Sequence, residues 1–227
     1  MQEISWKDNL RIAWFGCFLT GASISLVVPF MPIFVEQLGV EGDQVAFYSG
    51  LAISVSAISA AFVSPIWGIL ADKYGRKPMM IRAGLAMTIT MGGLAFVPNV
   101  FWLLFLRFLN GVFTGFVPNA TALIASQVPK DKSGYALGTL STGVVAGTLT
   151  GPFVGGLIAE FFGIRNVFLL VGIFLFLAAA LTILFIKEDF QPVPKEKALP
   201  TKELFTSVKY PFLLINLFLT SFVIQFA

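Results

Sequence analysis

Long runs without a charged side chain divide this sequence, and they limit its possible folds more than any other feature. Six of these runs, each 21 to 28 residues long, cover 12–35, 44–71, 83–106, 108–129, 133–159 and 166–186. A helix of about 20 residues crosses the hydrocarbon core of a bilayer. Because that core offers no partner to backbone polar groups, apolar runs without alternation predict helices. We therefore expect an all-α membrane protein with six transmembrane helices.

The composition argues against several other classes. Hydrophobic residues make up 57% of the chain, and histidine is absent. An imidazole base, a histidine triad and a histidine metal ligand are therefore excluded. Paired mid-membrane carboxylates and a G-x-S-x-G motif are also missing, so we expect neither an enzyme nor a cofactor. The single Cys17 lies inside an apolar run, which predicts a small buried side chain.

The positive charges indicate how the helices are oriented. Most of the lysines and arginines fall at the N-terminus or after the second, fourth and sixth runs, and cytoplasmic loops are the ones enriched in these residues. We expect a multi-pass protein of the cell membrane with a cytoplasmic N-terminus, a lipid bilayer as partner and no nucleic acid. Arg107 is expected to be the one cation inside a span. The 13 cations assigned to the cytoplasmic side are Lys7, Arg11, Lys73, Arg76, Lys77, Arg82, Lys130, Lys132, Lys187, Lys195, Lys197, Lys202 and Lys209.

The chain also repeats itself at an offset of 88 residues. The matched positions fall around the second and fifth runs, which would end on opposite faces of the membrane. Three helices followed by three helices of inverted orientation form a pattern found in secondary transporters. The identical pairs are Asp43 and Asp131, Gly50 and Gly138, Gly68 and Gly156, Ala71 and Ala159, and Gly75 and Gly163.

The sequence predicts three parts: a six-helix bundle at 1–187, a charged, proline-containing cytoplasmic linker at 188–210, and the start of a seventh helix at 211–227. The seventh run has no polar flank. We expect that it is cut short and that the other half of the same protein follows. The alternative is a chain of native half size that dimerises.

The segment 68–77 reads GILADKYGRK and resembles the signature of the major facilitator superfamily. The resemblance implies the N-terminal six-helix bundle of such a transporter, built from two inverted three-helix repeats. It also implies a conformational latch in which Asp72 pairs with Arg76. A cytoplasmic anchor with no role in transport is the alternative. The residues assigned to the latch are Gly68, Asp72, Gly75, Arg76 and Lys77.

A second segment, 103–115, resembles the motif L-x-x-x-R-x-x-x-G-x-x-x-G of the same family. An arginine at membrane depth is costly, so it should face protein or water. Helical spacing places Arg107, Gly111, Thr114 and Pro118 on one stripe, with Asn110 beside it. The resemblance assigns Arg107, Asn110, Gly111 and Thr114 to the central cavity and the proton-coupling site. The alternative is that Arg107 extends to the membrane surface.

A third segment indicates the direction of transport. Glycines recur every four residues in the fifth run, starting at Gly143, and such stripes pack helices closely. The ending Gly-Pro-x-x-Gly-Gly resembles the motif of drug:proton antiporters, which are exporters. A proline in a span bends the helix. The residues assigned to this motif are Gly138, Gly147, Gly151, Pro152, Gly155 and Gly156.

The sequence as a whole predicts one half of a twelve-helix multidrug efflux pump. Its substrates would be small amphipathic drugs, and its energy source would be the proton gradient. A nutrient symporter of the same fold and a non-transporting receptor or scaffold are the alternatives. No carboxylate lies at mid-span, so the coupling acid should belong to the absent half, or Glu36 should serve.

Overall fold

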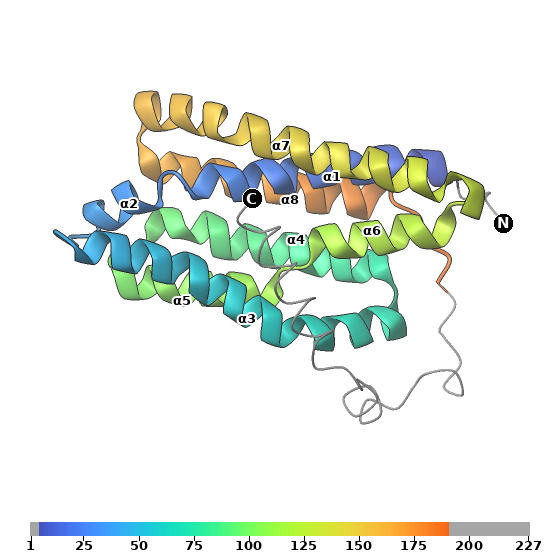
Figure 1. Ribbon diagram of the computed structural model, residues 1–227, viewed down its shortest axis with the longest axis horizontal. Coiled ribbons are helices and arrows are strands. Elements are labelled where there is room, and N and C mark those ends of the chain that lie inside the picture. The colour runs from blue at the N-terminus through green and yellow to red at the C-terminus, as the bar shows by residue number, and fades with distance from the viewer. Residues whose placement is uncertain (1–4, 191–227) are drawn as a thin grey trace. The chain divides into compact units, whose positions relative to one another are not determined.

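The computed structural model describes residues 5–190, which fall in one compact unit (Figure 1). That part of the chain contains six helical spans long and apolar enough to cross a membrane, which confirms the predicted fold class. The spans are Trp6–Val27, Gln44–Tyr74, Arg76–Phe96, Val100–Gln127, Lys130–Phe162 and Ile164–Phe185. The predicted helix at 211–227, and the predicted linker beyond residue 190, lie outside the described residues.

Eight α-helices and two short 3₁₀ helices make up these spans. Their bounds are α1 Trp6–Val27, α2 Met31–Gln37, α3 Gln44–Tyr74, α4 Arg76–Gly93, η1 Leu94–Phe96, α5 Val100–Phe113, α6 Phe116–Gln127, η2 Lys130–Lys132, α7 Ser133–Phe162 and α8 Ile164–Phe185. The first predicted run, 12–35, is divided because α1 ends before a turn at 28–30 and the short α2 follows it.

Two of the predicted spans, 83–106 and 108–129, have the wrong boundaries. The helices turn at 97–99, inside the third uncharged run, where Pro98 is followed by Asn99. The side chain of Asn99 accepts a hydrogen bond from the backbone N–H of Trp102 and so caps α5.

Arg82 lies within α4 and not in a loop, so Arg107 is not the only cation inside a span. The predicted boundaries were placed at Arg82 and Arg107 because these residues are charged, but the bundle accommodates both arginines inside its spans.

The helices pair in a pattern consistent with an internal two-fold relation. The first span, α1, packs along the fifth, α7, while the second, α3, packs along α5 of the fourth (Figure 1). The third and sixth spans, α4 and α8, pack on each other. Exchanging spans one to three with spans four to six leaves this set of pairs unchanged, as two inverted repeats require.

The turns after the repeated helices have nearly the same backbone geometry. Gly75 ends α3 with φ 100° and ψ 161°, and Gly163 ends α7 with φ 86° and ψ 159°. Each glycine N–H donates to the carbonyl four residues earlier, and the next helix begins at the following residue. A positive φ favours glycine because it has no Cβ. The matched glycines of the sequence repeat therefore form matched turns.

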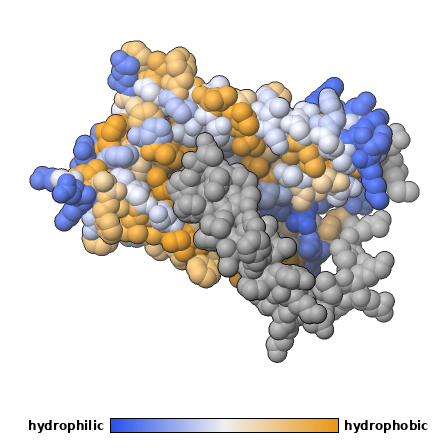
Figure 2. Space-filling view, in the orientation of Figure 1, coloured by the Kyte–Doolittle hydropathy of each residue, from blue (hydrophilic) through white to orange (hydrophobic). Residues whose placement is uncertain are grey.

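The surface follows the pattern of a membrane protein. Figure 2 shows hydrophilic side chains gathered at the two ends of the helices and hydrophobic ones between them. Large apolar side chains such as Phe62 on α3 and Phe153 on α7 are more than 70% exposed within the bundle. Cys17 is fully buried, as its sequence context predicted.

Candidate functional site

The segment predicted as a latch forms the tight connection between α3 and α4. The carboxylate of Asp72, near the end of α3, accepts a hydrogen bond from the guanidinium of Arg76, the first residue of α4. The carboxylate is 59% exposed and can therefore reach a further partner. The structure brings together the two residues that the resemblance paired.

Glu188, just beyond α8, holds the first turn of α4. Its two carboxylate oxygens accept the backbone N–H groups of Arg76, at 2.7 Å, and Lys77, at 2.8 Å. These groups have no acceptor within their own helix, and a negative charge is stabilising at a helix N-terminus. A Cβ on Gly75 would lie 2.8 Å from Glu188 Oε2, so a side chain here would displace this carboxylate in addition to straining the positive φ.

The same end of the bundle is joined by a buried amide. Asn9 of α1 is 2% exposed, and its Nδ2 donates to Gln127 Oε1 of α6 and to the carbonyl of Lys187. Its Oδ1 accepts the backbone N–H of Lys187. On the α4 side, Lys77 Nζ donates to the carbonyls of Ile183 and Ile186. The ends of α1, α4, α6 and α8 are thus hydrogen-bonded into one block.

Arg107 faces protein in the interior of the bundle. The side chain is 7% exposed, and its Nε donates to the carbonyl of Ala52 in α3 at 3.0 Å. Its Nη1 lies 3.7 Å from the sulfur of Met91 in α4. Within residues 5–190 Arg107 forms no ion pair with a carboxylate. This burial excludes the alternative in which Arg107 extends to the membrane surface.

The fourth span is broken close to Arg107. α5 ends at Phe113, Thr114 has extended backbone angles, and Gly115 has φ 125°. Pro118 therefore does not continue the stripe of Arg107 and Gly111, which corrects the predicted single helical face. Asn110 remains buried beside the arginine, where its Oδ1 accepts a hydrogen bond from Thr90.

Two side chains from other helices satisfy carbonyls at this break. Trp67 Nε1 donates to the carbonyl of Val112 at 2.6 Å, and Arg82 Nη2 donates to that of Thr114 at 3.2 Å. The guanidinium carbon of Arg82 lies 3.4 Å from the centre of the Trp67 ring. Within the described part of the chain, Arg82 Nε and Nη1 are buried without a hydrogen-bond partner. A cation is favourable here because the C-terminus of α5 carries the negative end of its dipole.

The glycine stripe of α7 lies directly against α1. A Cβ on Gly143 or Gly151 would come 2.8 Å from a backbone oxygen of α1, that of Trp14 or Ala22. A Cβ on Gly147 would fall onto the carbonyl of Phe18. Gly155 is likewise closed off by Leu26. Only glycine allows the two backbones to approach this closely.

A second contact between the repeats, that of α5 with α3, uses the same principle. Gly111 of α5 packs on Ser56 and Ser59 of α3, where a Cβ would collide with both residues. Ser59 is 88 residues before Gly147, so positions matched by the sequence repeat lie in both contacts. In contrast, Gly68, Gly138 and Gly156 have open space around the Cβ position.

Pro152 lies inside α7, within this contact. Because proline has no N–H, the carbonyl of Thr148 loses its helical donor. Ser25 of α1 supplies a replacement: its Oγ donates to the Thr148 carbonyl at 2.7 Å. The α1–α7 contact therefore contains both the glycine stripe and a hydrogen bond that depends on the proline.

A sequence profile described as Major Facilitator Superfamily matches residues 13–227. The chain belongs to the major facilitator superfamily. The segment 68–77, which contains Asp72, lies at the α3–α4 turn of this chain, and the segment 103–115, which contains Arg107, lies on its broken fourth span.

Named relatives extend the similarity over the whole chain. The multi-drug resistance efflux pump PmrA of Streptococcus pneumoniae is 87% identical over 227 residues, which is 100% of this chain and 57% of that protein. The multidrug resistance protein MdtG of a Rahnella species is 51% identical, over 99% of this chain and 55% of that protein. The chain thus spans a little more than half the length of these relatives.

Two solved transporter structures share the fold. The crystal structure of the human organic anion transporter MFSD10 (TETRAN) matches with a TM-score of 0.72 at 16% identity, over 88% of this chain and 53% of that one. The peptide-transporter-family protein PepTSo matches with a TM-score of 0.73 at 16% identity, over 84% and 40%. Both comparisons agree with the six-helix bundle.

Sequence reasoning missed four contributors to these sites: Glu188, Asn9, Ser25 and Arg82. Glu188 follows the last span in a short charged segment, and that position was the one available signal. For Ser25, the orphaned carbonyl that Pro152 implies could have prompted a search for a donor. Arg82 was assigned to a loop because of its charge. Glu36, the alternative coupling acid, is exposed at the end of α2.

Ser25→Ala should lower the stability of the protein by about 1–3 kcal/mol, because it leaves a partly buried carbonyl without a donor. In a Pro152→Ala background the backbone N–H returns to α7, so the same serine substitution should cost less than half as much. Thermal unfolding of the four proteins of this double-mutant cycle in detergent measures the difference. Equal costs in both backgrounds would show that Ser25 does not compensate for the proline.

Proposed function

We propose that the full-length protein exports amphipathic drugs in exchange for protons. The observation that carries the proposal is the similarity of the whole chain to proteins named multidrug efflux pumps. The export direction is supported further by the Gly-Pro-x-x-Gly-Gly segment of α7, which forms the close contact with α1. The proton gradient would be the energy source, and no cofactor would be needed.

The site geometry is suited to alternating access. The buried Arg107, the break in the fourth span and the glycine-lined α1–α7 contact lie in the two repeats of one bundle, and in such transporters the substrate passes between two bundles. The proposed partner is therefore a second six-helix half, which would also supply the coupling carboxylate. Asp72, exposed at the end of α3, would contact that half in one conformation.

The proposed location is the cell membrane, with the N-terminus and residues 130–132 on the cytoplasmic side. The lysines in that short segment support this orientation. A cysteine placed at position 131 on a Cys17→Ser background should react with a membrane-impermeant maleimide only in inside-out vesicles. Labelling in intact cells would place position 131 outside the cell and contradict the proposed orientation.

Dye efflux from cells tests the proposed activity. Cells producing the full-length protein are loaded with ethidium, and its loss is followed with and without a protonophore. We expect efflux that stops when the proton gradient collapses, and strongly reduced efflux in Asp72→Asn, which removes one charge at a turn. Efflux that persists without the gradient would contradict proton coupling, and no efflux of any drug tested would contradict the activity.

A further inference from the structure

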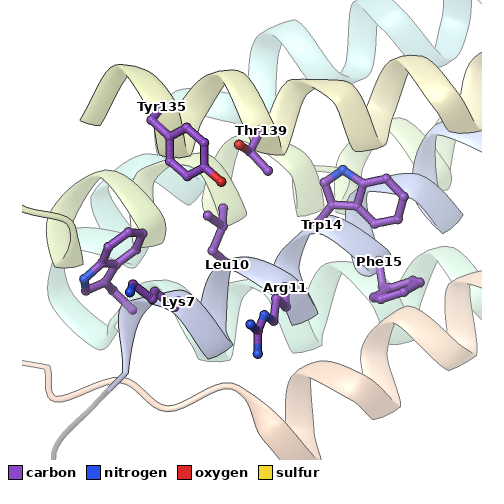
Figure 3. Close-up of a pocket in the computed structure, with 8 residues that line it drawn as sticks. Lys7, Leu10, Arg11, Trp14, Phe15, Tyr135 and Thr139 are labelled. Atoms are coloured by element: carbon purple, nitrogen blue, oxygen red, sulfur yellow. The ribbon is translucent and has the colours of Figure 1, made fainter. Parts of the chain in front are cut away.

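A pocket opens between the beginnings of α1 and α7 (Figure 3). Its volume is about 420 Å³. In Figure 3, Lys7 and Arg11 of α1 lie across from Tyr135 and Thr139 of α7, with Leu10 between them. Small-molecule pockets have volumes of roughly 300–1,000 Å³, so this one fits one small molecule and not a whole phospholipid.

Aromatic rings form the wall of the pocket farther along α1. The indole of Trp14 is fixed by a hydrogen bond from its Nε1 to Thr142 of α7 at 3.0 Å. It stacks on Phe18, with ring planes 9° apart, and meets Phe15 edge to face, with centroids 5.1 Å apart. Rings held in this way present flat apolar surfaces and edges against which another aromatic ring packs favourably.

The charged part of the pocket has an excess of one positive charge. Lys7 and Arg11 both line it, and among residues 5–190 the carboxylate that pairs with either of them is Asp8, 3.4 Å from Arg11. Lys7 Nζ lies 5.8 Å from the ring centre of Trp6 and, within residues 5–190, has no carboxylate partner. The Arg11 and Asp8 side chains are 76% and 68% exposed, so their attraction is weak and Arg11 can turn to another anion.

We propose that this pocket binds amphipathic aromatic anions. A sulfonate or carboxylate group would lie between Lys7 and Arg11, and the aromatic body would pack against Trp14 and Phe15. The hydroxyls of Tyr135 and Thr139 would donate to the polar end of the ligand. The proposal rests on the proposed function, because it assigns to the same transporter a holding place for one further class of ligand, anions, besides the cationic dye used to test export.

Two fluorescent probes with a shared skeleton test the proposal. Anilinonaphthalene sulfonate carries an anionic group, and N-phenylnaphthylamine lacks it. The full-length protein is placed in phosphatidylcholine nanodiscs, and binding is followed by energy transfer from tryptophan to the probe. Arg11→Gln should weaken binding of the sulfonate by about threefold to fivefold, the gain expected from one exposed charge contact. Binding of the neutral probe should not change.

A charge change of the opposite sign gives a second readout. Asp8→Asn releases Arg11 and should tighten binding of the sulfonate by a similar factor. Trp102→Phe, on the distant α5, is the control for energy transfer and should leave both affinities unchanged. If Arg11→Gln and Asp8→Asn leave sulfonate binding unchanged, or if both probes respond equally, the proposal is overturned.

Anionic lipid is the competing occupant. If phosphatidylglycerol in the nanodisc abolishes the effect of Arg11→Gln on the sulfonate, the cations bind a lipid headgroup and the proposal fails. Dye efflux measured in parallel separates the two hypotheses. Normal proton-dependent efflux without charge-dependent probe binding would contradict only the proposed anion-binding pocket. Charge-dependent binding without efflux would contradict only the proposed function.

Discussion

Gly147→Leu should abolish drug export. The substitution adds four carbon atoms on the face of α7 that lies against α1, where a Cβ alone would fall onto the Phe18 carbonyl. The two helices must then separate, and overpacking of this kind costs about 1–3 kcal/mol or more. We expect the variant to insert and to bind drug, because one conformation survives, while ethidium efflux falls to the level of cells without the transporter.

Val145→Leu is the matched control for this substitution. Val145 is on the same helix but is 55% exposed, so a longer side chain there should leave efflux unchanged. Loss of folded protein in Gly147→Leu, but not in Val145→Leu, would show that the contact is static packing and not a moving interface. Normal efflux in Gly147→Leu would contradict the described α1–α7 contact itself.

Arg107→Met should also reduce export to background, but without weakening the fold. Methionine fills a similar volume, and an arginine at the centre of a span costs about 2.5–3.5 kcal/mol on insertion scales. The carbonyl of Ala52 that accepts Arg107 Nε lies within α3, where a helical donor is available to it. We therefore expect thermal stability equal to or above that of the parent protein, with no proton-dependent efflux.

Met91→Leu tests whether export depends on the charge of Arg107 or on its contact with Met91. It removes the sulfur that lies 3.7 Å from Arg107 Nη1 but keeps the guanidinium, so efflux should persist. Full efflux in Arg107→Met would show that the arginine has no part in coupling. A marked loss of stability in the same variant would instead indicate a structural role.

The fold could be predicted from the sequence because helix length in a membrane is set by bilayer thickness, and the 88-residue repeat revealed the two inverted three-helix repeats. The boundaries of the third and fourth spans could not be predicted. An uncharged run marks a span only when all charges lie outside it, and both Arg82 and Arg107 lie inside. Each is held by backbone carbonyls or rings of other helices, contacts that spacing along one helix does not show.

The candidate site was predicted in part for the same reason. Spacing alone correctly placed Gly147, Gly151 and Gly155 on one packed face, since that face follows from helical geometry. The resemblance to the antiporter motif also grouped Gly138 and Gly156 with them, yet these two positions face open space within the described bundle. The partners Ser25 and Glu188 are distant in sequence from the groups they bind, so only the tertiary fold identifies them.

Proton movement in a reconstituted system tests the proposed drug:proton antiport most directly. The full-length protein is placed in liposomes that contain the pH dye pyranine, and a drug gradient is imposed with no initial pH difference. We expect drug movement in one direction to drive protons in the other, and we expect neither Arg107→Met nor Gly147→Leu to show this exchange. Drug movement without any proton movement, or protons moving in the same direction as the drug, would contradict an antiporter.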